Sequence, residues 1–138
     1  MKALSHEQLT VLLRFSHPEK VYPTLGETAI AEIFAIPVET YRQIKSECAA
    51  STRQAAEELL AEPDFGLRVD RLPFAPGSTV VGVGDSITDD WQSWLEILRA
   101  LLSIRRPNDH IRVVNAAVSG NQRCAQIRRE TLESRSQP

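Results

Sequence analysis

The most constraining feature of the sequence is a short β-branched segment, residues 79–83, that runs directly into the tight turn Gly84-Asp85-Ser86. A helical pattern follows this turn, and a second β-branched segment, residues 111–118, follows the helix. The helical pattern places apolar side chains three and four positions apart, on one face: Trp91, Trp94, Leu95, Leu98, Leu101 and Leu102. A strand, a helix and a second strand predict a βαβ unit with parallel strands and a right-handed crossover. The predicted fold class is therefore α/β.

Four segments differ in composition. Residues 1–62 carry apolar side chains at helical intervals in three stretches, the third covering residues 38–61, and predict an all-helical N-terminal segment. Residues 63–78 contain three prolines and two glycines, which predict an irregular connector. We expect this connector to pack on the sheet through its apolar side chains Leu67, Val69, Leu72 and Phe74. Residues 79–120 hold the βαβ unit, and residues 121–138, which have few apolar side chains, predict a frayed tail.

The composition excludes several classes of protein. With 138 residues, 42% of them hydrophobic, the chain fits one globular domain, and its net charge of −2 gives no general attraction to nucleic acid or anionic membranes. No apolar run approaches the ~20 residues that span a bilayer, and charges interrupt the N-terminus where a secretory signal would be apolar. We therefore expect a cytoplasmic protein in which Cys48 and Cys124 are free thiols, without metal-ligand spacing.

Two turns should meet at one edge of the predicted sheet. Residues 84–89 and residues 115–120 each follow the carboxyl end of a strand, where open α/β sheets bind their ligands. Ser86 would lie at the positive end of a helix dipole, which favours charge developing on an oxygen. The amides of Ser86 and Gly120 could then point into one cavity and stabilise an oxyanion, at about 3–4 kcal/mol per donor. The plainer alternative is an ordinary strand-to-helix turn in which Ser86 or Thr88 caps the helix.

The two turns resemble the first two motif blocks of the SGNH, or GDSL-type, ester hydrolases: Gly84-Asp85-Ser86-Ile87-Thr88 and Asn115-Ala116-Ala117-Val118-Ser119-Gly120-Asn121. The resemblance covers roughly residues 68–120 and implies a flavodoxin-like α/β/α sandwich. It also implies a small ester or acylated substrate, a serine acyl-enzyme and no cofactor. Ser86 matches the nucleophile and Gly120 the oxyanion glycine, and the other matching positions shape the motif: Gly84, Asp85, Thr88 and Asn115.

The rest of the family pattern is missing. The chain contains neither the Gly-x-Asn-Asp block nor the Asp-x-x-His block that supplies the acid and the base. His110 precedes the second strand and would lie at the opposite edge of the sheet from Ser86, while His6 and His17 belong to the helical segment and have no carboxylate partner that the sequence identifies. Because two parallel strands are too few for a self-sufficient sheet, we expect an incomplete sandwich, the product of a truncation or a frameshift, with little or no turnover.

Asp89 and Asp90 could suggest a metal site or an acid pair. Their place in the expected first turn of the helix explains them more simply, because acidic side chains there match the helix dipole. We therefore predict no metal ion. The arginines of residues 121–138 could contact phosphate, but a solvated chain end accounts for them better.

Residues 27–46 offer a different function, because their apolar spacing resembles a helix-turn-helix. In a DNA-binding module, Arg42 and Lys45 would contact the DNA. Glu39 and Glu47 oppose the basic face that phosphate contacts require, so we favour a helical cap on the hydrolase and expect no nucleic-acid partner. A third alternative is a non-catalytic fragment whose uncovered sheet edge pairs with a partner or with a second copy of the chain.

Overall fold

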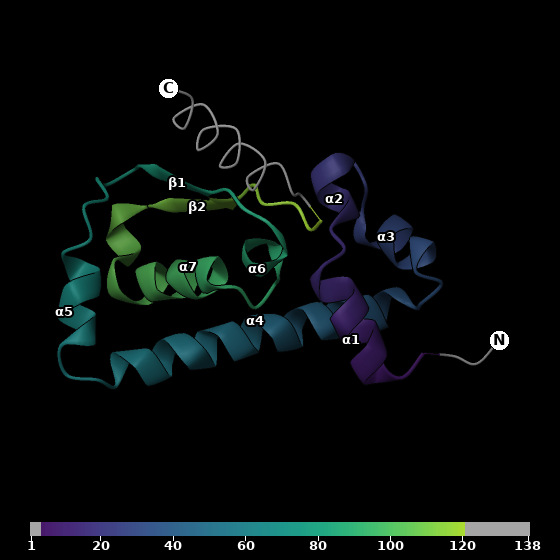
Figure 1. Cartoon of the computed structure of the whole chain (residues 1–138), viewed down its shortest axis with the longest axis horizontal. Coiled ribbons are helices and arrows are strands. Elements are labelled where there is room, and N and C mark those ends of the chain that lie inside the picture. The colour runs from purple at the N-terminus through teal and green to yellow at the C-terminus, as the bar shows by residue number, and fades with distance from the viewer. Residues whose placement is uncertain (1–3, 121–138) are drawn as a thin grey trace, which may run out of the picture.

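The computed structural model of the chain describes residues 4–120 (Figure 1). The N-terminal half consists of helices: α1 (His6–Arg14), α2 (Pro18–Val21), α3 (Glu27–Ile33), α4 (Val38–Leu60) and α5 (Phe65–Asp70). The second half contains the strands: β1 (Thr79–Gly82), α6 (Ser86–Asp89), α7 (Trp94–Arg105), the 3-10 turn η1 (Pro107–Asp109) and β2 (Arg112–Asn115). The predicted helix over residues 38–61 is confirmed almost to the residue.

The two strands are parallel, as the βαβ pattern predicts. Thr79 of β1 lies opposite Arg112 of β2, and Gly82 lies opposite Asn115. The two segments that follow the strands are also hydrogen-bonded to each other, because the Val118 amide donates to the Gly84 carbonyl over 3.1 Å. The α/β class is therefore confirmed. Within residues 4–120 the sheet has two strands, so the larger flavodoxin-like sandwich remains a prediction.

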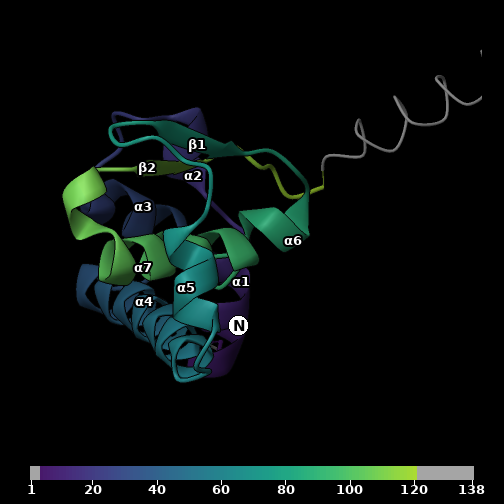
Figure 2. The same cartoon turned by 90° about the vertical axis from the view of Figure 1, so that its left-hand side faces the viewer.

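Within the described residues, one face of the sheet is covered by helices and the other face is not. Figures 1 and 2 show the sheet above α7, and α4 beneath α7. Between these layers lies a core that includes Ala56, Val69, Leu95, Leu101, Leu102 and Val113. Gly82 allows β1 to approach this core closely, since a Cβ atom at this position would lie 2.3 Å from Cδ2 of Leu95. The outward-facing valines of the two strands, Val81 and Val114, are exposed to solvent, and so are Val83 and Val118 just beyond the strand ends.

A second core joins the N-terminal helices: Leu13, Ile30, Ala31, Tyr41, Ile44 and Cys48. Trp91, from the segment between α6 and α7, packs against this core. The long helix α4 contributes to both cores, with Ile44 in one and Ala56 in the other. The long helix α4 therefore connects the core of the helical segment to the core of the βαβ unit.

Two local predictions are wrong. The connector over residues 63–78 is not irregular throughout, because it contains the short helix α5. Its predicted packing beneath the sheet is confirmed for Val69, Leu72 and Phe74, whereas Leu67 is half exposed. The helix after the serine turn is also divided, because α6 ends at Asp89 and α7 begins at Trp94. Local spacing could not reveal this break, since the intervening residues bind partners in the N-terminal segment, as shown below.

Candidate functional site

Ser86 is the first residue of α6, directly after the cap of that helix. The cap is Asp85, whose carboxylate accepts a hydrogen bond from the Ile87 amide over 3.1 Å. The predicted cap, Ser86 or Thr88, is therefore wrong, because Asp85 occupies that position, but the plainer alternative of an ordinary strand-to-helix turn is not contradicted. Since α6 has a single turn, the dipole near Ser86 is smaller than a helix running on from Asp89 would supply.

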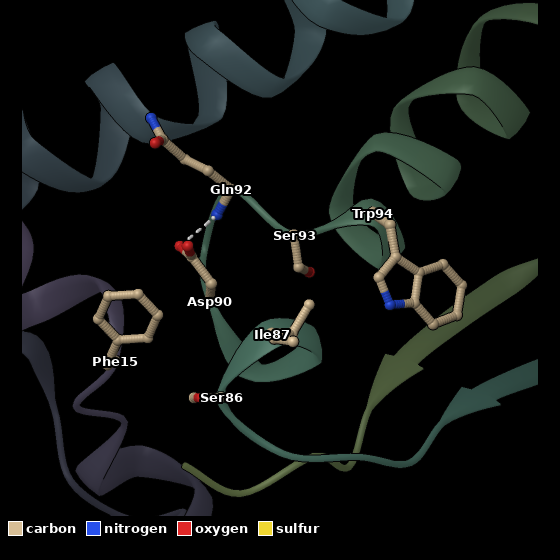
Figure 3. Close-up of a pocket in the computed structure, with 7 residues that line it drawn as sticks. All are labelled: Phe15, Ser86, Ile87, Asp90, Gln92, Ser93 and Trp94. Atoms are coloured by element: carbon tan, nitrogen blue, oxygen red, sulfur yellow. Dashed lines mark hydrogen bonds between the residues drawn. The ribbon is translucent and has the colours of Figure 1, made fainter.

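Ser86 is half-buried and lines an open pocket of about 410 Å³. Figure 3 shows the residues around this pocket, which come from the end of α1, from α6, from the segment between α6 and α7 and from the start of α7: Phe15, Ser86, Ile87, Asp90, Gln92, Ser93 and Trp94. The Phe15 ring stands across the pocket from Trp94. The N-terminal helical segment thus forms part of the wall beside the serine.

Gly84 and Thr88 fit together closely at the serine turn. A Cβ atom on Gly84 would lie 2.7 Å from Oγ1 of Thr88, so any larger residue would push the turn open. Oγ1 of Thr88 also accepts a hydrogen bond from the Trp94 indole over 3.1 Å. The same contact that requires a glycine therefore ties α6 to the start of α7.

Asn115, the last residue of β2, joins the two turns. Its Nδ2 donates to the Thr88 carbonyl over 2.8 Å, and its Oδ1 accepts from the Ala117 amide over 3.1 Å. The first bond reaches the serine turn and the second shapes the turn that leads to Gly120. Each of the four positions assigned to motif shaping thus makes a contact that holds one of the turns.

Gly120 lies at the same edge of the sheet as Ser86, because each follows the carboxyl end of one of two parallel strands. Its φ of 78° falls in the left-handed region that favours glycine. Within residues 4–120, the Ser86 amide donates no hydrogen bond. The geometry thus allows two backbone donors at one edge, as an oxyanion site requires.

Asp89 is buried, and it lies in the single turn of α6 rather than in the long helix. One carboxylate oxygen accepts from the Lys20 ammonium, and the other accepts from the Ser119 amide over 2.8 Å and from the Ser119 hydroxyl over 2.7 Å. Burial raises the pKa of Asp89, but the bonds from Lys20 and Ser119 outweigh burial and hold the pKa below its ordinary value.

Asp90 is also buried, and its partner is the guanidinium of Arg14 at the end of α1. The Arg14 carbonyl accepts from the Trp91 amide over 3.2 Å, so the same residue binds two neighbours in the break between α6 and α7. The prediction that Asp89 and Asp90 lie in the first turn of the long helix is wrong. Tertiary partners hold both residues outside that helix. The sequence did show two adjacent acidic residues directly before Trp91, which could have indicated buried ion pairs, but it did not identify their partners.

Two histidines have carboxylate partners that the sequence did not identify. Nδ1 of His17 accepts from the Trp91 indole over 2.7 Å, and Nε2 lies 3.5 Å from a carboxylate oxygen of Asp89. His6 lies 2.8 Å from Glu47. His110 is an exposed residue just before β2, as predicted, at the opposite edge from Ser86. Among the described residues, no histidine lines the pocket of Ser86.

The cations of the helix-turn-helix alternative make contacts within the chain. Arg42 donates to Glu27 over 2.8 Å, and the Lys45 ammonium lies 5.6 Å from the centre of the Tyr41 ring. Ala35, in the turn between α3 and α4, has a φ of 51°, the conformation for which a glycine is common. These contacts leave Arg42 neutralised by a carboxylate rather than directed at a phosphate.

Between residues 4 and 120, no three His, Cys, Asp or Glu side chains are grouped closely enough to bind a metal ion, and none of the helices could cross a bilayer. Cys48 is a free, buried thiol whose pKa is raised by burial. Cys124 and the predicted frayed tail lie outside the described residues.

At the carboxyl edge of the sheet, hydrogen bonds fasten the turn of Ser86 to the turn that leads to Gly120. Such an arrangement can present a hydroxyl beside backbone donors, which is the combination that acyl transfer uses. Compared with models of protein families, with curated proteins and with solved structures, the chain has no match.

Proposed function

We propose that this chain carries the nucleophile half of a serine ester hydrolase of the SGNH type. The observation that supports the proposal is the position of Ser86, half-buried beside an open pocket at the carboxyl edge of a parallel sheet. The pocket of about 410 Å³ would accommodate a small ester or acyl group between Phe15 and Trp94. The reaction requires no cofactor.

In the proposed reaction, the Ser86 oxygen attacks the acyl carbon and its proton passes to a base. The amides of Ser86 and Gly120 would hold the oxyanion of the tetrahedral intermediate. The intermediate then expels the alcohol, which takes up a proton, and leaves an acyl group on Ser86. Water attacks this acyl-enzyme, releasing the acid and returning a proton to the serine.

Among residues 4–120, no histidine lines the pocket of Ser86 to serve as the base. His17 is enclosed by Trp91 and Asp89, and it borders a different pocket from the one that Ser86 lines. A serine without a base within hydrogen-bond reach is a weak nucleophile. We therefore propose slow turnover, which an added base would accelerate.

The test measures the rate at which a fluorophosphonate labels Ser86, read by mass spectrometry, with and without imidazole. We expect slow labelling that imidazole accelerates, because the open pocket admits a small base beside Ser86. Ser86→Ala should lose the label, whereas Ser103→Ala, which replaces an exposed serine on α7, should keep it. Labelling that is absent from Ser86, or that survives in Ser86→Ala, would refute the proposal.

A further inference from the structure

One lysine of the N-terminal segment contacts both turns at the carboxyl edge. The Lys20 ammonium, on α2, donates to Asp89 at the end of the serine turn. It also donates to the Ala117 carbonyl over 3.0 Å and lies 3.3 Å from Oδ1 of Asn115, both in the turn that leads to Gly120. Figure 1 shows α2 beside the chain that leaves β2.

We infer that Lys20 is a positioning residue that holds these two turns in one arrangement. The inference that this positioning matters for catalysis rests on the proposed function, in which Ser86 of one turn and Gly120 of the other act together. A separation between an attacking hydroxyl and an oxyanion donor is useful only when it is fixed. Lys20 fixes it from outside the motif.

The chemistry of the three contacts suits an ammonium group. Lysine has three N–H donors arranged around one nitrogen, and here three oxygens surround that nitrogen. The planar guanidinium of an arginine would direct its donors differently, and a neutral side chain would leave the buried Asp89 without its cation. Only 26% of the Lys20 side chain is exposed, which limits the screening of its ion pair with Asp89 by solvent.

Asp89 carries the effect onward to Gly120. The carboxylate oxygen that Lys20 does not bind accepts both the amide and the hydroxyl of Ser119, the residue before Gly120. Loss of Lys20 would free the Asp89 carboxylate to rotate, and the bonds to Ser119 would loosen with it. The position of the Gly120 amide would then no longer be fixed.

Lys20 is itself held firmly. It lies in the single turn of α2, which begins after His17, and its amide donates to the His17 carbonyl over 3.0 Å. The His17 ring is fixed in turn by the Trp91 indole. The N-terminal segment therefore acts on the turns through a short chain of bonded residues.

Amide hydrogen exchange of the full-length chain, followed by NMR, tests this inference without reference to activity. In Lys20→Met we expect the Ser119 and Ala117 amides to exchange faster by on the order of tenfold, while amides of α4 keep their wild-type rates. The matched control is Lys45→Met, which removes an exposed lysine of α4 and should leave all of these rates unchanged. Equal acceleration across α4 and the turns would show a general loss of stability and overturn the inference, as would unchanged exchange at Ser119.

The labelling rate of Ser86 provides a second readout, which tests whether the Lys20 contacts affect the reactivity of the serine. Lys20→Met should slow the labelling of Ser86 by a fluorophosphonate, and Lys20→Arg, which keeps the charge, should restore part of that rate. Full labelling in Lys20→Met would overturn the catalytic meaning of the contact. If the wild type is not labelled at Ser86, the proposed function fails, and the exchange experiment still decides whether Lys20 positions the turns.

Discussion

The guanidinium of Arg14 contacts both carboxylate oxygens of Asp90, a residue 76 positions further along the chain. The contact joins the end of α1 to the break between α6 and α7, in the wall of the serine pocket. Asp90 also accepts from the Gln92 amide over 2.8 Å (Figure 3). This one ion pair therefore holds the shape of the segment that separates the serine turn from the long helix.

Arg14→Met should destabilise the protein markedly, because it leaves the Asp90 carboxylate buried without its cation. We expect the free energy of unfolding in urea to fall by about 2–3 kcal/mol, near the lower bound for buried pairs, since Arg14 is partly exposed. The matched control is Arg42→Met, which breaks an exposed pair with Glu27 and should leave the free energy of unfolding close to the wild-type value. Equal effects of the two substitutions would show that the burial of Asp90 is unimportant.

The ion pair of Asp89 with Lys20 should make stability depend on pH. The pKa of Asp89 is held below its ordinary value of about 3.9, so the unfolded chain binds a proton more readily than the folded chain. The stabilisation is therefore complete above this ordinary value and is lost as the pH falls through the lower, folded-state pKa. The Asp89→Asn variant should be less stable than the wild type at pH 7, and this difference should shrink below about pH 4.

Urea unfolding of both proteins between neutral pH and about pH 2.5 measures whether the stability difference shrinks as the pH falls. Among residues 4–120, other carboxyl groups also have lowered pKa values, and comparison with Asp89→Asn separates Asp89 from them: Glu19, Glu27, Glu47 and Asp70. Asp64→Asn serves as the control, because Asp64 makes no capping hydrogen bond at the start of α5. A difference between Asp89→Asn and wild type that stays constant with pH would contradict the assignment.

Gly82→Ala should disturb the core beneath the sheet. The added methyl group would lie 2.3 Å from Cδ2 of Leu95, which is fully buried, so Leu95 or the strand must move. We expect a loss of about 1–3 kcal/mol in the free energy of unfolding. Gly26→Ala, where the new methyl group meets open space, should cost less than about 1 kcal/mol. A thermal or urea unfolding series that ranks the two variants in the opposite order would be inconsistent with the packing.

The sequence predicted those parts of the fold that depend on local pattern. The β-branched runs and the helical spacing between them were sufficient for the parallel βαβ unit, and Pro63 and the apolar spacing before it were sufficient for the long helix α4. The placement of both motif turns at one edge then followed from the parallel strands alone.

The parts that sequence reasoning missed depend on contacts between distant residues. Asp89 and Asp90 were assigned to a helix dipole because their partners, Lys20 and Arg14, lie in the N-terminal segment, far from them in sequence. The role of Gly82 was missed for the same reason, although a glycine inside a strand is a known sign of close approach. Local rules cannot predict which distant side chain fills such a gap.

Cys48 should be protected from thiol reagents in the native protein. It is almost fully buried at the junction of α4 and the N-terminal core, and burial raises the pKa of its thiol, so little of the reactive thiolate is present. In a Cys124→Ser background, which leaves a single thiol, iodoacetamide should modify Cys48 only at the rate at which the protein unfolds. Fast modification in the absence of denaturant would contradict the burial of this residue.

The open face of the sheet should drive self-association. Val81 and Val114 lie opposite each other in the parallel register, and both face solvent, although parallel sheets are normally covered on both sides. We expect the sedimentation coefficient of the wild type to rise with protein concentration. The double variant Val81→Lys/Val114→Glu places opposite charges side by side on this face, which preserves the strand pair while removing its apolar surface, and should sediment as a monomer. Val11→Lys, on the exposed side of α1, is the control and should associate like the wild type. A wild type that stays monomeric at every concentration, or a double variant that still associates, would show that this face is not the contact surface.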